Sequence, residues 1–304
     1  MWGRRNADAL RRAAELFEQA VAQDPGYALA WAGLADSTAL LIEYAGAPRA
    51  EKLPKARKAA LKALELDERC AEAHDALAVV HLYDWDWTAA ERELRRAIEL
   101  RPEYPSARHR YCLLLTNMGR WDEAIAGGQR ARALDPTSLP VNNILLAALF
   151  LSRHYEDAIT QAKRTLELDP NYGLARYHLA RSYGGQARFA EAIEQMEAGG
   201  AEARTGHSPG FLGYLYGVTG QRDKALAVLA RLDAQAASGV HVSPTAYATL
   251  HMGLGNRDEA LAWLEKSVAE FDVFLSYGIV GDYVWDPLRP TERFARVLKQ
   301  TNLK

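Results

Sequence analysis

Cysteine is nearly absent from this sequence of 304 residues, which contains only Cys70 and Cys112. Two thiols so far apart fit no metal-ligand spacing and make no disulfide framework, so we expect a reducing compartment. Long apolar runs are missing as well. The longest, Ile144 to Leu151, is far too short to span a bilayer, and no signal-peptide stretch follows Met1. We therefore expect a cytoplasmic chain with no membrane segment.

An excess of charge of one sign is also lacking. The 37 basic residues nearly balance the 39 acidic ones, giving a net charge of −2, so no global field attracts nucleic acid or an anionic membrane. Valine and threonine are sparse, whereas alanine, the strongest helix former, fills about 54 positions. The composition predicts an all-α protein and argues against nucleic acid as a partner of this chain.

Motifs for catalysis are absent too. The chain has no HExxH, no phosphate loop, no nucleophile elbow and no CxxC. Its eight histidines are scattered, and glycine pairs such as Gly184 and Gly185 follow no strand. Close packing or flexibility explains these pairs better than a phosphate cradle does. We expect no enzyme activity, no bound metal and no cofactor.

What the sequence does contain is a 34-residue repeat. Alanines recur at this step at Ala90, Ala124, Ala158 and Ala192. Prolines keep the same step at Pro102, Pro136 and Pro170. Four consecutive units follow without insertion, over residues 71–104, 105–138, 139–172 and 173–206. Such a period is typical of a solenoid built from helical repeats.

These units resemble the tetratricopeptide repeat in their period and in the placement of small and aromatic residues. The unit 71–104 carries the signature at Leu77, Ala78, Trp87, Ala90, Leu94, Ala97 and Pro102. Weaker copies flank the four units, as a partial unit over 1–27 and as units over 28–70, 206–239 and 241–272. We expect about seven to eight helix-turn-helix repeats over residues 1–272. Stacked neighbours would form a right-handed superhelical solenoid with one continuous core.

The unit 28–70 departs from the period. It is about nine residues longer than the other units. Small residues and a proline lie near its middle, around residues 45–48. We expect the surplus to lie there, between the two helices of the unit.

The tail from Asp272 onward differs in kind from the repeats. It is rich in β-branched and aromatic residues, namely Val273, Phe274, Leu275, Tyr277, Ile279, Val280, Tyr283, Val284 and Trp285. We expect two short extended stretches or an irregular loop here, followed by a final helix from about Thr291 to Gln300. Because a terminal repeat needs a finished outer face, residues 273–304 are expected to form an irregular cap over the eighth unit.

Three strings narrow the resemblance. They are WDPLRPTERFARVL near the end, YDWDW from Tyr83 to Trp87, and the opening from Trp2 through the segment ALAWAGLAD. They are similar to the C-terminal tetratricopeptide arrays of larger bacterial signalling proteins, which begin with a winged-helix DNA-binding domain, a Ser/Thr kinase or an adenylyl cyclase. This sequence contains none of those parts. The resemblance implies a regulatory or scaffolding context and no catalytic activity of the chain itself.

In such arrays a partner binds along the groove lined by the first helix of each unit. The second, fifth, ninth, twelfth and thirteenth positions of a unit share the inward face of that helix. The candidate groove residues are Asp75, Tyr83, His109, Asn117, Asn143, Phe150, Tyr177 and Arg181. This mixture of apolar, aromatic and hydrogen-bonding groups suits an extended peptide or a helix. Chaperone-binding arrays hold a carboxylate with lysine at the fifth position and asparagine at the ninth, and this sequence has neither.

Two further features of the sequence are a tryptophan pair and a basic run. Trp87 shares the aromatic position of the repeat and is expected in the core, whereas Trp85 is one residue out of register and is a candidate for an exposed contact in the turn. The basic run from Lys52 to Lys62 is expected to be a solvated helix face. The favoured function is a non-enzymatic scaffold that binds a protein or peptide in its groove. The alternative is the C-terminal sensory or docking part of a bacterial kinase, cyclase or transcriptional regulator.

Overall fold

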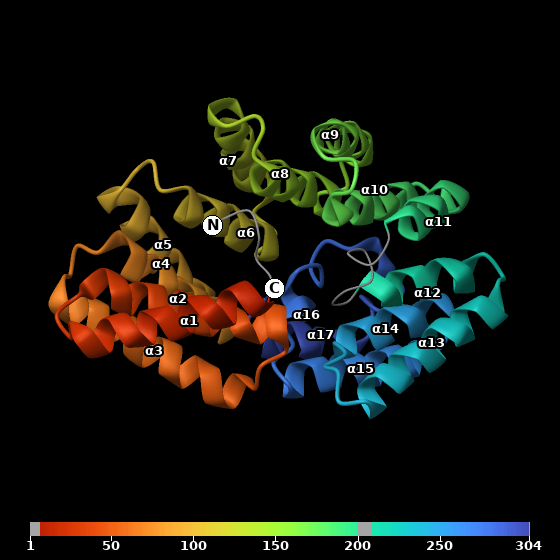
Figure 1. Cartoon of the computed structure of the whole chain (residues 1–304). Coiled ribbons are helices and arrows are strands. Elements are labelled where there is room, and N and C mark those ends of the chain that lie inside the picture. Colours follow the sequence, from red (N-terminus) through yellow and green to blue (C-terminus); the bar gives the residue numbers. More distant parts are fainter. Residues whose placement is uncertain (1–6, 200–207, 304) are drawn as a thin grey trace. The chain divides into compact units, whose positions relative to one another are not determined.

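The computed structural model describes residues 7–199 and 208–303, and every regular element within these ranges is helical (Figure 1). The prediction of an all-α fold is confirmed. The start of the first expected unit, the boundary near residue 206 and the last residue of the cap lie outside the described residues. Packing divides the chain into two compact units, Met1–Leu114 and Leu115–Lys304.

The first unit is a stack of antiparallel helices. Its helices are α1 (Ala7–Gln23), α2 (Ala28–Ala45), α3 (Arg49–Leu66), α4 (Ala71–Tyr83), α5 (Trp87–Leu100) and most of α6 (Pro105–Asn117). Each helix packs on the next from α1 to α5, and α2 also packs directly on α4. This is the arrangement in which helix pairs share apolar faces that no pair buries alone. Leu94 and Leu114 are among the side chains it buries completely.

The second unit continues the pattern. Its helices are α7 (Trp121–Leu134), α8 (Leu139–Leu151), α9 (Tyr155–Leu168), α10 (Gly173–Gly185), α11 (Phe189–Ala198), α12 (Ser208–Val218), α13 (Arg222–Ala237), α14 (Pro244–Gly253) and α15 (Arg257–Ala269). The first helices of successive pairs pack on each other, α8 on α10 and α12 on α14. We call the surface formed by α8, α10, α12 and α14 the inner face.

The ends of the second helices follow from the sequence. At the residues that end α3, α5, α7 and α9 the backbone is extended, with φ of −147° at Asp67, −141° at Arg101, −137° at Asp135 and −145° at Asp169. Proline follows the last three of these residues. A proline disfavours helical backbone in the residue before it, so each helix ends where the 34-residue step places the proline.

The turns inside the helix pairs also repeat. In each pair from α4–α5 onward, the second residue after the end of the first helix has positive φ. The values are 55° at Trp85, 74° at Gly119, 66° at Arg153, 59° at Ala187, 76° at Gly220 and 77° at Gly255. Only glycine adopts this left-handed region without cost. The turn therefore has one geometry in six successive pairs, whether or not glycine occupies the position.

The long unit 28–70 stores its surplus inside its helices. Helices α2 and α3 have 18 residues each, whereas α4 has 13. The connection between α2 and α3, residues 46–48, is as short as the connection 84–86 between α4 and α5. The expectation that the surplus lies between the helices is wrong. A run rich in Ala, Leu and Lys from residue 55 to residue 66 simply extends α3 by further turns.

Helices α12 and α14 approach each other unusually closely. A Cβ added at Gly210 would collide with the backbone of Ala246, and one added at Gly253 would collide with the backbone of Tyr214. Because Gly210 and Gly253 have no side chain, the backbones of α12 and α14 lie in direct contact, which brings the first helices of the last two pairs together. Phe211, Leu215 and Leu250 fill the surrounding core completely.

The tail contains short helical turns and no strand within residues 273–303. It comprises α16 (Val273–Ser276), a 3-10 turn (Tyr283–Trp285) and α17 (Glu292–Gln300). Of the two expected conformations for its first part, the extended stretches are wrong. Helix α17 begins after Thr291, whose hydroxyl accepts from Phe294 N at 3.2 Å, and it packs on α15. The other parts of the tail also contact the last helix pair, because α16 packs on α15 and the 3-10 turn packs on α14.

Candidate functional site

Arg181 lies at the centre of the candidate site in the second unit. Tyr177 and Arg181 stand one turn apart on α10, and Arg181 Nη1 donates to the Tyr177 hydroxyl at 2.6 Å. The guanidinium carbon lies 4.7 Å from the ring centroid of Phe150 on α8, 5.1 Å from that of Tyr177 and 5.5 Å from that of Phe211 on α12. Three expected groove residues are thus brought together, and cation–π attraction holds the guanidinium among the rings.

The partner of Arg181 comes from the tail. Arg181 Nη2 forms an ion pair with Asp282, and the two side chains are 8% and 2% exposed. The other oxygen of Asp282 accepts from Val284 N at 3.2 Å, which starts the 3-10 turn. A buried guanidinium in an apolar site needs a compensating carboxylate, and this chain supplies its own.

Tyr283 fills the aromatic part of the same site. Its ring meets those of Phe150, Tyr155 and Tyr214 at centroid distances of 6.3, 6.4 and 6.2 Å, with interplanar angles of 83°, 87° and 67°. Such edge-to-face contacts are favourable beyond the area they bury. A Cβ on Gly184 would collide with the Tyr283 hydroxyl. Within the described residues that hydroxyl has no hydrogen-bond partner.

We call residues 278–289 the docked segment. A Cβ on Gly281 would collide with the carbonyl oxygen of Leu151 at the end of α8. Asp286 accepts from Arg153 at 2.6 Å and from Arg289 at 2.8 Å. The segment contacts side chains of α8, α10 and α12, and Tyr283–Trp285 also packs on α14. The expected cap over the eighth unit is also a plug in the inner face.

Burial controls protonation at this site. It lowers the pKa of His178 to about 3, and the nearby charge of Arg181 acts in the same direction. It raises the pKa of Tyr214 to about 12, and that of Tyr283 well above its usual value. These groups are neutral at pH 7. The site is therefore organised to hold a carboxylate and rings, without a side chain among these three poised for proton transfer.

Two other expected groove residues belong to the second unit. Asn117 is buried at the end of α6, and Asn143 is half-buried on α8. The side-chain oxygen of each is buried without a hydrogen-bond partner in the described residues. Asp282, Tyr283 and Asp286 were missed as site residues. The signal was present as acidic residues and glycines alternating with aromatics in the tail, but nothing local indicates which surface such a segment covers.

The expected groove residues of the first unit serve in packing. Arg110 on α6 donates to Asp75 on α4 at 2.6 Å and also pairs with Asp36 on α2. Burial lowers the pKa of Arg110, but the two carboxylates outweigh it and raise that pKa above its usual value. The Tyr83 hydroxyl donates to Glu43 at 2.9 Å. His109, next to Arg110, is half-buried.

Trp85 is not the exposed contact that the sequence favoured. It is 2% exposed. The turn between α4 and α5 gives Trp85 a left-handed backbone, with φ of 55°, and the indole lies against the protein instead of pointing into solvent. The expectation of exposure is wrong because the backbone conformation of the turn, and not the polarity of the neighbouring residues, decides where the Trp85 side chain points.

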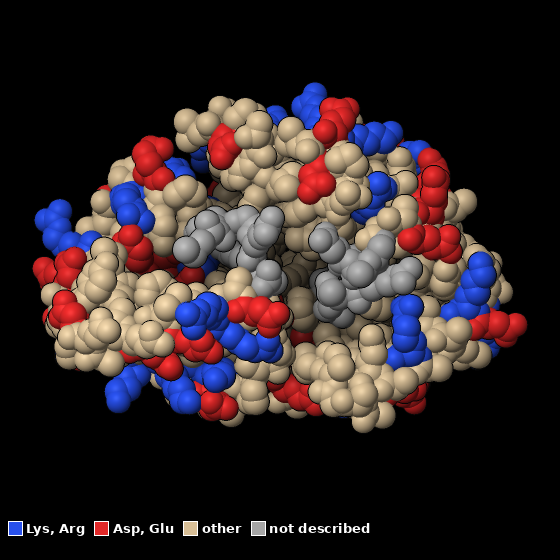
Figure 2. Space-filling view, viewed as in Figure 1, with Lys and Arg blue, Asp and Glu red and all other residues tan. Residues whose placement is uncertain are grey.

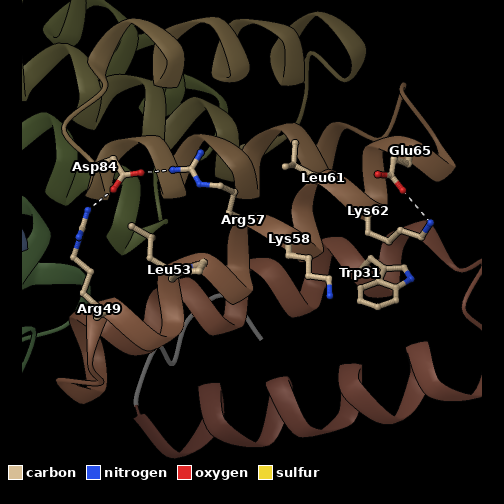
Figure 3. Close-up of a pocket in the computed structure, with 11 residues that line it drawn as sticks. Trp31, Arg49, Leu53, Arg57, Lys58, Leu61, Lys62, Glu65 and Asp84 are labelled. Carbon is tan, nitrogen blue, oxygen red and sulfur yellow. Dashed lines mark hydrogen bonds and ion pairs between the residues drawn. The ribbon is translucent and has the colours of Figure 1, made fainter.

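The first unit has a shallow groove of its own along α3, with a volume of about 730 Å³ (Figure 3). Asp84 lies between Arg49 and Arg57 and pairs with both, and Lys62 pairs with Glu65 at 2.9 Å. Its ionisable lining residues are Arg49, Arg57, Lys58, Lys62, Glu65 and Asp84. Four basic and two acidic groups leave a surplus of two positive charges. On the face shown in Figure 2, basic and acidic side chains are interspersed.

No family model matches the chain, and no curated protein matches its sequence. Among solved structures, a tetratricopeptide repeat protein from Parabacteroides merdae superposes with a TM-score of 0.57, at 12% identity, over 90% of this chain and 99% of that one. The fold is the tetratricopeptide repeat fold. PilW, a type IV pilus biogenesis factor, gives a TM-score of 0.49 at 16% identity, over 88% of this chain and 98% of that one. YrrB, a tetratricopeptide repeat protein with an unusual peptide-binding site, gives 0.43 at 21% identity, over 62% and 92%.

Among residues 7–199 and 208–303, no helix has both the length and the hydropathy needed to cross a bilayer. The same residues contain no group of three or more His, Cys, Asp or Glu side chains placed to hold a metal ion.

Proposed function

We propose that this chain is a non-enzymatic interaction scaffold that binds a peptide or helix of a partner protein on the inner face of its second unit. The observation that carries the proposal is the docked segment. Arg181 and the surrounding rings already hold an irregular stretch of polypeptide there through a carboxylate and an aromatic side chain. A surface that binds one such stretch has the chemistry to bind another.

The proposed binding surface is narrower than the set of groove residues expected from the sequence. It comprises Asn143, Phe150, Tyr177 and Arg181, with Asn117 at its edge. Asp75 and Tyr83 are left out because their polar atoms bond other helices of the first unit. Removing them would damage packing before it affected a partner.

Site-specific photocrosslinking tests this surface. A photoreactive phenylalanine analogue at the half-buried Asn143 should crosslink a partner in cells. The matched control carries the same group at Leu226 on α13, which is 41% exposed and belongs to the same unit. Partner peptides recovered from position 143 and not from position 226 would support the proposal. The same products from both positions, or products from 226 alone, would refute it.

The resemblance to bacterial signalling arrays supports a second candidate. In it the chain is the cytoplasmic sensory or docking part of a kinase, cyclase or transcriptional regulator. The string WDPLRPTERFARVL, which is part of the resemblance, builds the end of the docked segment and α17, where Trp285, Leu288 and Phe294 are buried. The intact mass of the endogenous protein tests this candidate. A mass near 33.7 kDa would contradict it, and a much larger mass would support it.

A further inference from the structure

We propose that the docked segment is an internal stand-in for the partner, so that the partner peptide carries an acidic residue followed by an aromatic one and replaces Asp282 and Tyr283 on the inner face. This inference rests on the proposed function and specifies the partner's chemistry.

The contacts of the segment resemble recognition more than core packing. An apolar pair of the same volume in place of Arg181 and Asp282 would avoid the desolvation of two charges, and such replacements are often neutral or stabilising. The Tyr283 hydroxyl is buried without a hydrogen-bond partner among the described residues, where a phenylalanine would leave no polar atom unsatisfied. The buried charges of Arg181 and Asp282 and the hydroxyl of Tyr283 reduce stability relative to apolar side chains, but they allow the site to distinguish one peptide sequence from another.

The segment is held at both ends by anchors that do not depend on it. On its N-terminal side, Asp272 accepts from Ser243 Oγ at 2.6 Å, from Thr245 Oγ1 at 2.7 Å and from Thr245 N at 3.1 Å. On its C-terminal side, Arg293 on α17 donates to Glu265 on α15 at 2.9 Å. Residues 278–289 can therefore leave the inner face while α16 and α17 stay in place.

A second acidic residue defines the spacing that the partner needs. Asp286 follows Asp282 by four residues and pairs with Arg153, which belongs to the turn after α8. Between the two carboxylates lie Tyr283, Val284 and Trp285; Val284 and Trp285 are buried, and Tyr283 is half-buried with its hydroxyl inside the protein. The surface thus matches a peptide with the order acidic, aromatic, aliphatic, aromatic, acidic. A competing partner must supply all of these groups, because the apolar ones also leave water when the segment docks.

The experiment offers the segment in trans to the full chain. The probe is a fluorescein-labelled peptide of residues 278–290, and the control peptide has asparagine at the positions of Asp282 and Asp286. Gly281→Ala is the opening variant, because its Cβ collides with Leu151 and pushes the chain's own segment off without altering the receptor surface. Gly278→Ala is the matched control, because its Cβ meets no atom closer than 3.7 Å.

Fluorescence anisotropy should show the acidic peptide binding Gly281→Ala at least about tenfold more tightly than the wild type or Gly278→Ala. The asparagine peptide should bind Gly281→Ala at least about tenfold more weakly than the acidic peptide. Adding Arg181→Met to the opening variant should reduce the difference between the peptides to the part that the exposed Arg153–Asp286 pair contributes. Equal binding of the two peptides, or no binding to a folded Gly281→Ala, would overturn the inference. If circular dichroism shows that Gly281→Ala does not fold, the Asp282→Asn/Asp286→Asn variant replaces it with the same expectations.

The two proposals fail separately. If the two peptides bind equally while position 143 still forms specific crosslinks, the inference of an acidic-aromatic partner is refuted and the proposed scaffold function stands. Peptide binding that depends on Arg181, without any crosslinked partner, would assign the inner face to the chain's own segment and remove the scaffold.

Discussion

Asp282→Asn should destabilise the second unit far more than a matched change four residues away. The asparagine keeps the shape of the side chain and an oxygen that accepts from Val284 N, so the 3-10 turn retains its cap. Only the charge is lost. Arg181 is then left buried, 8% exposed, without its carboxylate.

Removing one partner of a buried ion pair costs about 3–5 kcal/mol. The rings of Phe150, Tyr177 and Phe211 still attract the guanidinium, so we expect a loss near the lower end, about 3 kcal/mol in the free energy of unfolding. Asp286→Asn is the control, because Asp286 and Arg153 are 40% and 45% exposed. An exposed pair of this kind contributes at most about 1 kcal/mol.

Guanidinium titrations followed by circular dichroism measure both losses. Hydrogen exchange of residues 278–289 shows whether the docked segment opens before the rest of the unit unfolds. Replacing both partners, as Arg181→Met/Asp282→Leu, should recover most of the stability. If Asp282→Asn costs no more than Asp286→Asn, the buried pair does not hold the segment and the reasoning fails.

Three further predictions concern other positions. Burial lowers the pKa of His178 to about 3, so its contribution to stability is complete above about pH 6.5, where the side chain is neutral in both the folded and the unfolded chain. That contribution is lost as the pH falls toward 3. Relative to His178→Phe, the unfolding free energy of the wild type should therefore drop by up to about 1.4 kcal/mol per pH unit across that window. In a denaturant titration Gly210→Ala should lower the unfolding free energy by at least about 2 kcal/mol, because its Cβ collides with the backbone of α14. Gly239→Ala is the control: its Cβ meets open space, and only its φ of 82° is unfavourable, so it should lose about 1 kcal/mol. Equal losses would contradict the close approach of α12 and α14. In thermal melts Ala187→Gly should stabilise the protein by about 0.5–1 kcal/mol, because the exposed alanine has a strained φ of 59° that glycine adopts without strain. Trp85→Gly, at the equivalent turn position, should destabilise the protein by about 3 kcal/mol, because a buried indole is lost. Stability changes of the same sign in both variants would refute the argument.

The burial of Trp85 shows where local inference from the sequence stops. Trp85 lies in a polar string, between Asp84 and Asp86, which favours exposure. Its burial depends on the left-handed turn, whose φ recurs after each first helix from α4 to α14. That recurrence is visible in sequence only where glycine occupies the turn, as at Gly119, Gly220 and Gly255. Tryptophan at the same position hides the geometry.

Groove positions were also predictable only in part. The helical offset correctly indicates that Tyr177 and Arg181 share a face of α10, because residues four apart are neighbours on a helix. It carries no information on what covers that face. Asp75, chosen by the same rule, instead pairs with Arg110 between α4 and α6.

The sequence by itself determined the class, the repeat length and the ends of the helices. These depend on local properties: the preference of alanine for helix, the restriction before Pro102, Pro136 and Pro170, and the apolar face that recurs every 34 residues. Tertiary structure alone decided that the tail occupies the inner face and that Asp282 neutralises Arg181. The reason is physical. An ion pair between groups distant in the chain forms only when packing brings both out of water together, and no periodicity in the sequence encodes that meeting.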